Sequence, residues 1–245
     1  MDKALYVAMT GASASLRAQA SVANNLANVD TAGFKAELAA TEAFQVRGPG
    51  WNSRVAAVPI EQGFDRSVGA IHQSDRPLDI ALLEGRWLAV QATDGTEAYT
   101  RNGQLQVNAL GQLTTSGGEP VLGEGGPIAI PPYQQINIGS DGSISIVPQG
   151  QTAATVAIVG RLRVVDAPAE RLQRRPDGLM RDTQGGFEPA AGRVLTSGAY
   201  EGSNVNAASE MVQMIQLQRQ YEMQVKVISR ADENARSANG LLKLS

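Results

Sequence analysis

The chain has 245 residues and a formal net charge of −3, from 21 lysine and arginine residues against 24 aspartate and glutamate residues. A chain of this length can bury a sizeable core in one or two domains. The slightly acidic balance, without any basic stripe, argues against a nucleic-acid-binding protein. There is no cysteine, and His72 is the only histidine. Disulfides, thiolate metal sites and multi-histidine metal centres are therefore excluded, and a hydrolytic triad would depend on that one residue.

We predict a helix over residues 2–28. Its apolar and small residues recur at alternating intervals of four and three, which is typical of a narrow seam that packs on another helix. The alanine-rich filling favours helix and allows a close approach to the partner. The seam consists of Leu5, Met9, Ala12, Leu16, Gln19, Ala23 and Leu26.

The start of this helix imitates a signal peptide, because Lys3 precedes the apolar run Ala4–Met9 and a small-residue motif ends at Ala20. Thr10 and the residues after it break the run, so we expect the segment to stay on the protein. No window of the chain approaches the roughly 20 apolar residues that span a bilayer, which argues against membrane insertion.

Asparagines that favour caps and turns predict that this helix ends near Asn28, and Gly33 can adopt the left-handed conformation that follows helices. Phe34 is an isolated aromatic in polar surroundings. It fits either a local contact onto the helix end or a contact with a neighbouring subunit. Residues 36–76 lack a clear period, so we expect a loop or an extended arm that serves a function or an interface.

All eleven prolines lie between Pro49 and Pro189. From Leu78 onward, short β-branched and apolar runs alternate with turn pairs, which predicts antiparallel strands in an irregular sandwich or barrel. We expect hairpins at Asp94-Gly95, Asn102-Gly103 and Asp141-Gly142. The strands are predicted over 78–83, 87–93, 97–101, 104–108, 128–130, 135–138, 143–147 and 155–165, the last with a bulge at Gly160, and turns and short strands are predicted over 166–200.

The C-terminal segment, residues 201–245, predicts a second and longer helix over Ala207–Leu242, about 54 Å long at roughly 1.5 Å per residue. Asn204 or Asn206 can cap its start, and Glu210 places negative charge in its first turn. Its seam again alternates three and four residues, and its partner must lie in another helix of this chain or in another chain. The seam consists of Met211, Met214, Gln218, Tyr221, Val225, Ile228, Asp232, Ala235, Asn239 and Leu242.

These elements predict an α+β protein in which paired, coiled-coil-like terminal helices flank an inserted, mostly antiparallel β-rich domain. We expect an N-terminal helix and loop over 1–35, an arm over 36–76, the β-rich domain over 77–200 and the C-terminal helix over 201–245. The sequence carries none of the common nucleophile-elbow, phosphate-loop, zinc-protease or calcium-loop motifs. Scattered carboxylates such as Asp79 and Asp94 fit turns better than a catalytic pair. We therefore expect no enzyme activity, cofactor, metal or small-molecule substrate.

Three sets of residues resemble the flagellar rod and hook protein family. The segment 23–35, ANNLANVDTAGFK, is similar to the family's N-terminal signature. The segment 201–206, EGSNVN, followed by EMV (210–212), MI (214–215), QR (218–219) and YE (221–222), is similar to its C-terminal signature. The β-rich region resembles it in RPLDIA (76–81), YTRNG (99–103) and GQL (111–113). The short length and the opening MDKA (1–4) are most similar to a proximal basal-body rod protein, and the slightly longer distal rod protein is the alternative.

The resemblance implies a structural subunit of the flagellar rod that crosses the periplasm. It implies export through the flagellar type III apparatus without a cleaved signal, helical assembly with copies of itself and other rod proteins, and terminal helices that order on assembly. A secreted β-domain hydrolase and an adhesin are the alternatives. The expected assembly interface comprises Leu5, Met9, Leu16, Asn24, Asn25, Leu26, Asn28, Gly33, Phe34, Asn204, Asn206, Met211, Met214, Gln218, Tyr221, Val225 and Ile228.

Overall fold

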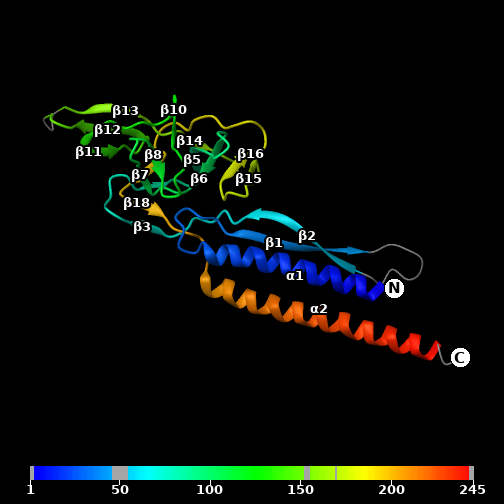
Figure 1. Ribbon diagram of the computed structural model, residues 1–245. Coiled ribbons are helices and arrows are strands. Elements are labelled where there is room, and N and C mark those ends of the chain that lie inside the picture. The colour runs from blue at the N-terminus through cyan, green and yellow to red at the C-terminus, as the bar shows by residue number, and fades with distance from the viewer. Residues whose placement is uncertain (1–2, 46–54, 152–154, 169, 243–245) are drawn as a thin grey trace. The chain divides into compact units, whose positions relative to one another are not determined.

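The computed structural model describes residues 3–45, 55–151, 155–168 and 170–242 (Figure 1). The chain divides into two compact units. Unit 1 comprises residues 1–29, 36–65 and 205–245, and unit 2 comprises residues 30–35 and 66–204. Helices near both ends of the chain and antiparallel strands between them confirm the predicted α+β class.

Unit 1 is built from the helices α1 (Lys3–Ala27) and α2 (Ala207–Leu242) and the strands β1 (Glu37–Gln45) and β2 (Val55–Phe64). Helix α1 packs against α2 on one side and against the β1–β2 hairpin on another, so it forms the middle layer (Figure 1). Asn25 near the end of α1 donates a hydrogen bond to Glu210 near the start of α2, at 3.3 Å. The two helices therefore run antiparallel, and their predicted pairing within the chain is confirmed.

The middle position of α1 explains its composition. Ala8, Ala12, Ala14, Ser15 and Val22 are buried, and the side chains of nearly all of them are small. At Gly11 an added Cβ would lie 3.0 Å from the side-chain nitrogen of Gln224, so the two helices come close at this point. Small residues on two sides of the helix let it touch two neighbours at short distance.

The seam of α2 differs from the predicted one at alternate positions. Met214, Tyr221 and Ile228 are half-buried as expected, but Met211, Gln218 and Val225 are exposed. The reason is that polar residues take those places against α1: Glu210 meets Asn25 and Gln224 lies over Gly11. The half-buried positions still alternate three and four apart, as Ala207, Glu210, Met214, Leu217, Tyr221, Gln224, Ile228 and Ala231.

Residues 36–76 contain regular structure where the sequence predicted an irregular segment. Strands β1 and β2 form a long antiparallel pair with a register shift between Glu37 and Ala39. The alanine-rich sequence of β1 lacks the strict alternation of apolar and polar residues that indicates a strand. The sequence pattern therefore could not predict β1.

Unit 2 consists of small antiparallel sheets around one hydrophobic core. A five-stranded sheet has the order β14-β5-β6-β16-β15, a three-stranded sheet has the order β11-β12-β13, and the pairs are β9–β10, β4–β17, β3–β18 and β7–β8. The strands are β3 (Ile71–Gln73), β4 (Ile80–Leu82), β5 (Arg86–Gln91), β6 (Glu97–Thr100), β7 (Leu105–Val107), β8 (Leu113–Thr115), β9 (Leu122–Gly123), β10 (Gly126–Pro127), β11 (Tyr133–Ile138), β12 (Ser143–Pro148), β13 (Ala157–Arg161), β14 (Val164–Asp166), β15 (Leu172–Arg174), β16 (Met180–Asp182), β17 (Leu195–Ser197) and β18 (Ala199–Glu201).

Two of the three predicted hairpins are confirmed. Gly95, at φ +82°, lies in the turn between β5 and β6, and Gly142, at φ +86°, lies in the turn between β11 and β12. The third prediction is wrong, because β7 pairs with β8 and not with β6. Gly103 is required there for a different reason: an added Cβ would lie 1.7 Å from the carbonyl oxygen of Ile80.

The predicted strand over residues 155–165 is divided into β13 and β14. Leu162 and Arg163 separate them. Leu162 is buried in the core and donates its backbone N–H to the Gly142 carbonyl at 2.8 Å. The predicted bulge is confirmed, since the register of β12 against β13 shifts opposite Gly160. Residues 128–130 make one isolated bridge, between Ala129 and Gln112, in place of the predicted strand. Residues 166–200 form turns and short strands, as expected.

Candidate assembly site

Helix α1 carries an exposed row of uncharged side chains on the face opposite its packed side. The row repeats every three or four residues along the helix, as a coiled-coil seam does. Tyr6 is 75% exposed, Met9 53% and Leu16 48%. We name this row the α1 outer stripe; it consists of Tyr6, Met9, Ser13, Leu16, Ala20, Ala23 and Ala27.

Helix α2 also exposes large apolar side chains. In residues 207–218 the only charged residue is Glu210, and Met211, Val212 and Ile215 are each more than half exposed. Further along the helix Met223, Val225 and Val227 are exposed as well. An apolar surface of this extent on a polar-rimmed helix is typical of an interaction site.

The predicted interface residues of α1 fall into three groups. Met9, Leu16 and Asn24 are exposed, whereas Leu5, Leu26 and Asn28 are half-buried. Asn25 is buried and holds unit 1 together. Its Oδ1 accepts the backbone N–H of Glu37 at 2.8 Å, and its Nδ2 donates to the Glu37 carbonyl at 3.0 Å and to Glu210.

The two candidate capping residues of α2 have different roles. The Oδ1 atom of Asn206 accepts the backbone N–H of Ser209 at 3.1 Å, so Asn206 is the N-cap. Asn204 belongs to unit 2, where its Nδ2 donates to the carbonyl and the hydroxyl oxygen of Ser67, at 3.1 Å and 3.2 Å.

Gly33 and Phe34 are buried in unit 2. Gly33 is left-handed, at φ +69°, as predicted, and an added Cβ would lie 2.2 Å from the carbonyl carbon of Arg101. The guanidinium carbon of Arg174 lies over the Phe34 ring, 4.4 Å from its centre. The guanidinium also donates to the Lys35 carbonyl at 2.9 Å, which holds the loop 30–35 in unit 2.

A buried cluster of three charges lies next to this loop. Glu201 has no exposed surface, and its Oε1 accepts hydrogen bonds from Lys35 Nζ at 2.7 Å and from the backbone N–H of Gly69 at 2.9 Å. Its Oε2 accepts from Arg101 Nε at 2.6 Å. One carboxylate therefore neutralises two buried cations only in part.

Backbone carbonyls complete the coordination of the two cations. The Arg101 guanidinium donates to the carbonyls of Leu82, Leu83 and Arg86 at 3.0, 3.2 and 2.7 Å, and Lys35 Nζ donates to the Ser67 carbonyl. Every charged group in the cluster thus has partners, which is what burial of charge requires. We name Lys35, Arg101 and Glu201 the ion cluster.

The ion cluster was not predicted from the sequence, although each of its members lies in one of the motifs that resemble the family. Lys35 ends the first motif, Arg101 lies in YTRNG and Glu201 begins EGSNVN. Two of these motifs carry a cation and the third carries an anion. These opposite charges are the signal that could have suggested an ion pair. It could not show burial, because burial here depends on contacts between segments that lie far apart in the sequence.

Several other titratable groups of unit 2 form structural pairs. Hydrogen bonds from Thr96 and Arg175 hold the pKa of the Asp94 carboxyl well below its usual range. Burial, together with the hydrogen bond to Glu97, raises the pKa of Tyr99 to about 12. Arg171 pairs with Asp182, and Arg175 pairs with Asp94 and Asp177.

Among the described residues, no group of three or more histidine, aspartate and glutamate side chains has the arrangement of a metal site. In the same part of the chain, neither helix has the length and apolarity of a membrane span.

Three family models match the chain in order. They are the "Flagella basal body rod protein" model over residues 5–35, the "Flagellar hook protein FlgE/F/G D1 domain" over 83–146 and the "Flagellar basal body rod FlgEFG protein C-terminal" model over 196–241. The flagellar basal-body rod protein FlgF of Escherichia coli (strain K12) is 47% identical over 253 residues, covering 100% of both chains. The chain belongs to the flagellar basal-body rod protein family.

Other relatives include both FlgF and FlgG rod proteins. FlgF of Salmonella typhimurium is 46% identical with 100% of both chains covered, whereas FlgG of Buchnera aphidicola subsp. Acyrthosiphon pisum is 34% identical, with 95% of this chain and 97% of the relative covered. The chain is therefore a structural subunit of the bacterial flagellar rod, and the predicted resemblance is confirmed.

Proposed function

We propose that this rod subunit assembles through the α1 outer stripe and the exposed apolar side chains of α2, and that its neighbours are copies of itself and other rod proteins. The observation that carries this proposal is the α1 outer stripe. Seven helical positions in a three-four repeat carry no charge, yet all seven side chains are exposed. A solvated helix face would carry charged residues there.

The energetics favour contacts by both helices at once. Full burial of a Leu or Met side chain stabilises by about 1.5–3 kcal/mol. Met9 and Leu16 are already about half covered, so one stripe gains a few kcal/mol at most. Association costs an estimated 4–15 kcal/mol. A subunit that contacts several neighbours through α1 and α2 together overcomes this cost, whereas a single stripe contact does not.

The subunit acts by assembly and has no enzymatic role in this proposal, and it stacks with its neighbours as a helical array in the rod. Export through the flagellar type III apparatus without signal cleavage is part of the same proposal. Its support is that residues 3–27 form α1, so cleavage after the Ala18-Gln19-Ala20 motif would remove most of the helix.

The test introduces one charge into the stripe. Leu16→Glu should abolish incorporation of the chain into basal bodies and the motility that depends on it, because a carboxylate would be buried without a partner. Arg17→Glu is the matched control: Arg17 is the adjacent exposed residue outside the stripe. Both variants should be produced in equal amounts. Normal incorporation of Leu16→Glu would refute the proposed surface.

A further inference from the structure

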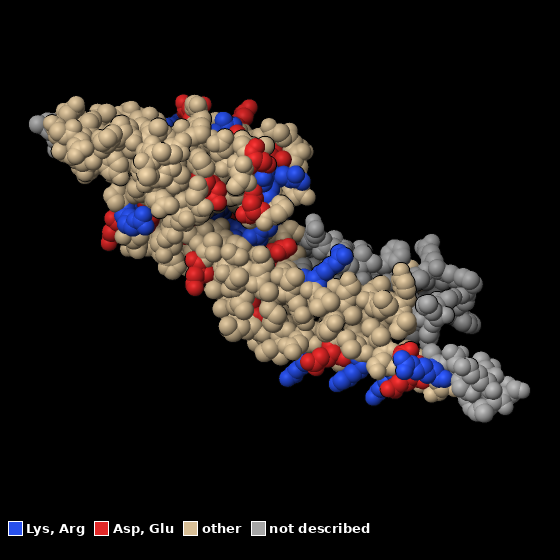
Figure 2. All heavy atoms as spheres, in the orientation of Figure 1, with Lys and Arg blue, Asp and Glu red and all other residues tan. Residues whose placement is uncertain are grey.

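One end of unit 2 is almost free of charge. Between Gly125 and Gly160 the only charged residue is Asp141, in a chain of which 18% is charged. This segment supplies β11, β12 and β13, and the face of their sheet seen in Figure 2, at the upper left, carries no lysine, arginine, aspartate or glutamate side chain. A partner with charged groups would lose their hydration there without gaining ion pairs. The surface therefore suits an uncharged partner.

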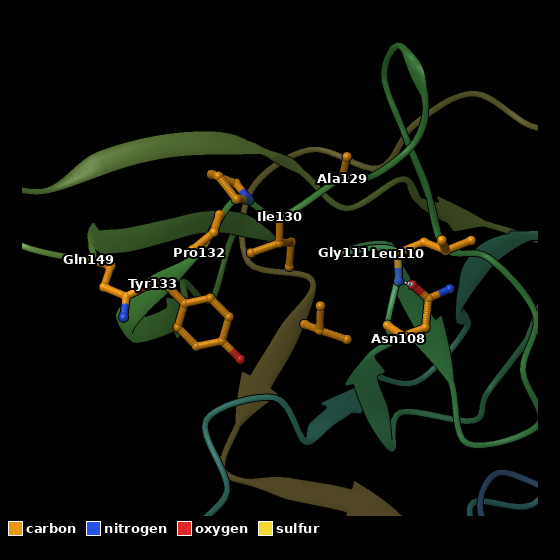
Figure 3. A pocket seen from close by; sticks show the side chains of 11 residues that line it. Asn108, Leu110, Gly111, Ala129, Ile130, Pro132, Tyr133 and Gln149 are labelled. Atoms are coloured by element: carbon orange, nitrogen blue, oxygen red, sulfur yellow. Dashed lines mark hydrogen bonds between the residues drawn. The ribbon is translucent and has the colours of Figure 1, made fainter.

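The first feature of this end is a groove of about 710 Å³. It lies between the turn Asn108–Gly111 and the segment Ala129–Tyr133, and no charged residue lines it (Figure 3). The backbone N–H of Ile130 donates to the Gly111 carbonyl at 2.7 Å and fixes the two walls together. Leu110 stands at the groove and is 83% exposed, the highest value among the large apolar side chains described.

The second feature is the edge strand β13. It pairs with β12 alone, so its other edge is open among the described strands. Val156 and Ile158 are 62% and 76% exposed. Ile158 pairs with Ser145, which lies between the buried Ile144 and Ile146, so Ile158 points away from the core. Natural edge strands are usually protected by charges or proline, and here the first charge is Arg161 at the end of the strand.

We propose that Val156 and Ile158 of one copy fill the groove beside Leu110 of a second copy. The groove adjoins Tyr133 on β11, and β11 and β13 are opposite edges of one three-stranded sheet. A copy therefore cannot place its own β13 edge in its own groove. Both surfaces are apolar and uncharged, which makes each the complement of the other.

Such a contact joins two different surfaces of the same chain, so it is heterologous and can repeat from copy to copy. It gives unit 2 a role in stacking beside the helix contacts of unit 1. The inference rests on the proposed function, since copies must lie next to one another in the rod.

The test uses the fact that the chain has no cysteine. Full-length Leu110→Cys and Ile158→Cys variants are produced together in one cell, basal bodies are purified, and disulfide cross-linking is measured under mild oxidation. We expect a cross-linked dimer of this chain only when both variants are present. The control combines Leu110→Cys with Gln184→Cys, in which an exposed residue elsewhere in unit 2 carries the thiol. Its cross-linking yield should be at least tenfold lower.

Four results would overturn the inference. Equal cross-linking by Ile158→Cys alone would mean that two β13 edges meet each other. Cross-linking to a different protein would give the groove another occupant. The absence of any cross-link in basal bodies that contain the chain would refute the contact and leave the proposed function intact. Absence of the chain from basal bodies would instead refute both.

Discussion

Glu201 is the residue on which the buried charges of unit 2 depend. Its carboxylate bonds to Lys35, Arg101 and the backbone of Gly69, so three segments distant in sequence meet at one side chain. Replacing a buried ion cluster by apolar residues is often neutral, but removing a single member leaves uncompensated charge. The stabilisation is thus conditional on all three members being present.

Glu201→Gln should destabilise unit 2 by about 3–5 kcal/mol, because it leaves two cations buried without a counter-charge. Urea unfolding of the full chain followed by tryptophan fluorescence measures this, since Trp87 is buried in unit 2. Glu170→Gln is the control. Its ion pair with Arg66 is exposed to solvent and its loss should have little effect. Equal effects of the two changes would contradict this role of Glu201.

Asp182 makes unit 2 sensitive to acid. Burial raises its pKa, but hydrogen bonds from Arg171 and from the backbone N–H groups of Gly186 and Gln184 outweigh this and lower the pKa below its usual range. An aspartate in the unfolded chain has a pKa of about 3.9. Folding therefore favours the charged form, and its stabilisation is complete above about pH 4 and is lost as the pH falls through the lower folded value.

Thermal unfolding between pH 5 and pH 2 should accordingly show a falling melting temperature. Asp182→Asn should lower the melting temperature at about pH 5 and flatten its decline below about pH 4, because the variant has no carboxylate to protonate. An unchanged pH dependence in the variant would show that Asp182 does not contribute.

At the scale of elements, the glycines show which structural features the sequence pattern could predict and which it could not. Gly95 and Gly142 serve turns between consecutive strands, and such turns have a local sequence signal. Gly103 also follows a turn-forming residue, Asn102. However, a glycine is required there because the backbone carbonyl of Ile80 leaves no room for a Cβ. No local sequence pattern indicates this contact. Likewise, the bounds of α2 were predicted correctly from its period, whereas the residues that face α1 depend on the partner helix.

Gly103→Ala should therefore destabilise unit 2 by about 3 kcal/mol or more, the upper part of the range for overpacking. Gly160→Ala is the matched control, since an added Cβ at that position meets nothing within 4 Å. We expect the control to stay within about 0.5 kcal/mol of the wild type. Chemical denaturation of the two variants gives the comparison, and a tolerated Gly103→Ala would contradict the close approach to Ile80.

For the whole molecule, the sequence predicted the order of helix, strands and helix, and it predicted that the terminal helices pair. It did not reveal that the loop 30–35 belongs to unit 2, or that residues 36–65 return to unit 1. These memberships follow from contacts such as Phe34 with Arg174 and Asn25 with Glu37, which join residues far apart or in different elements. The motif residues Gly33, Phe34 and Asn204 make such contacts inside unit 2, and their part in assembly stays a prediction.

The central claim is that the α1 outer stripe becomes buried when the subunit enters the rod. Because the chain has no cysteine, Ala23→Cys places a single thiol in the stripe. Its rate of modification by a maleimide is measured in purified basal bodies and in the isolated subunit, with Arg230→Cys on the exposed part of α2 as a reference. We predict that assembly slows modification at position 23 at least tenfold relative to the reference; equal rates in the rod and in the isolated subunit would contradict the account.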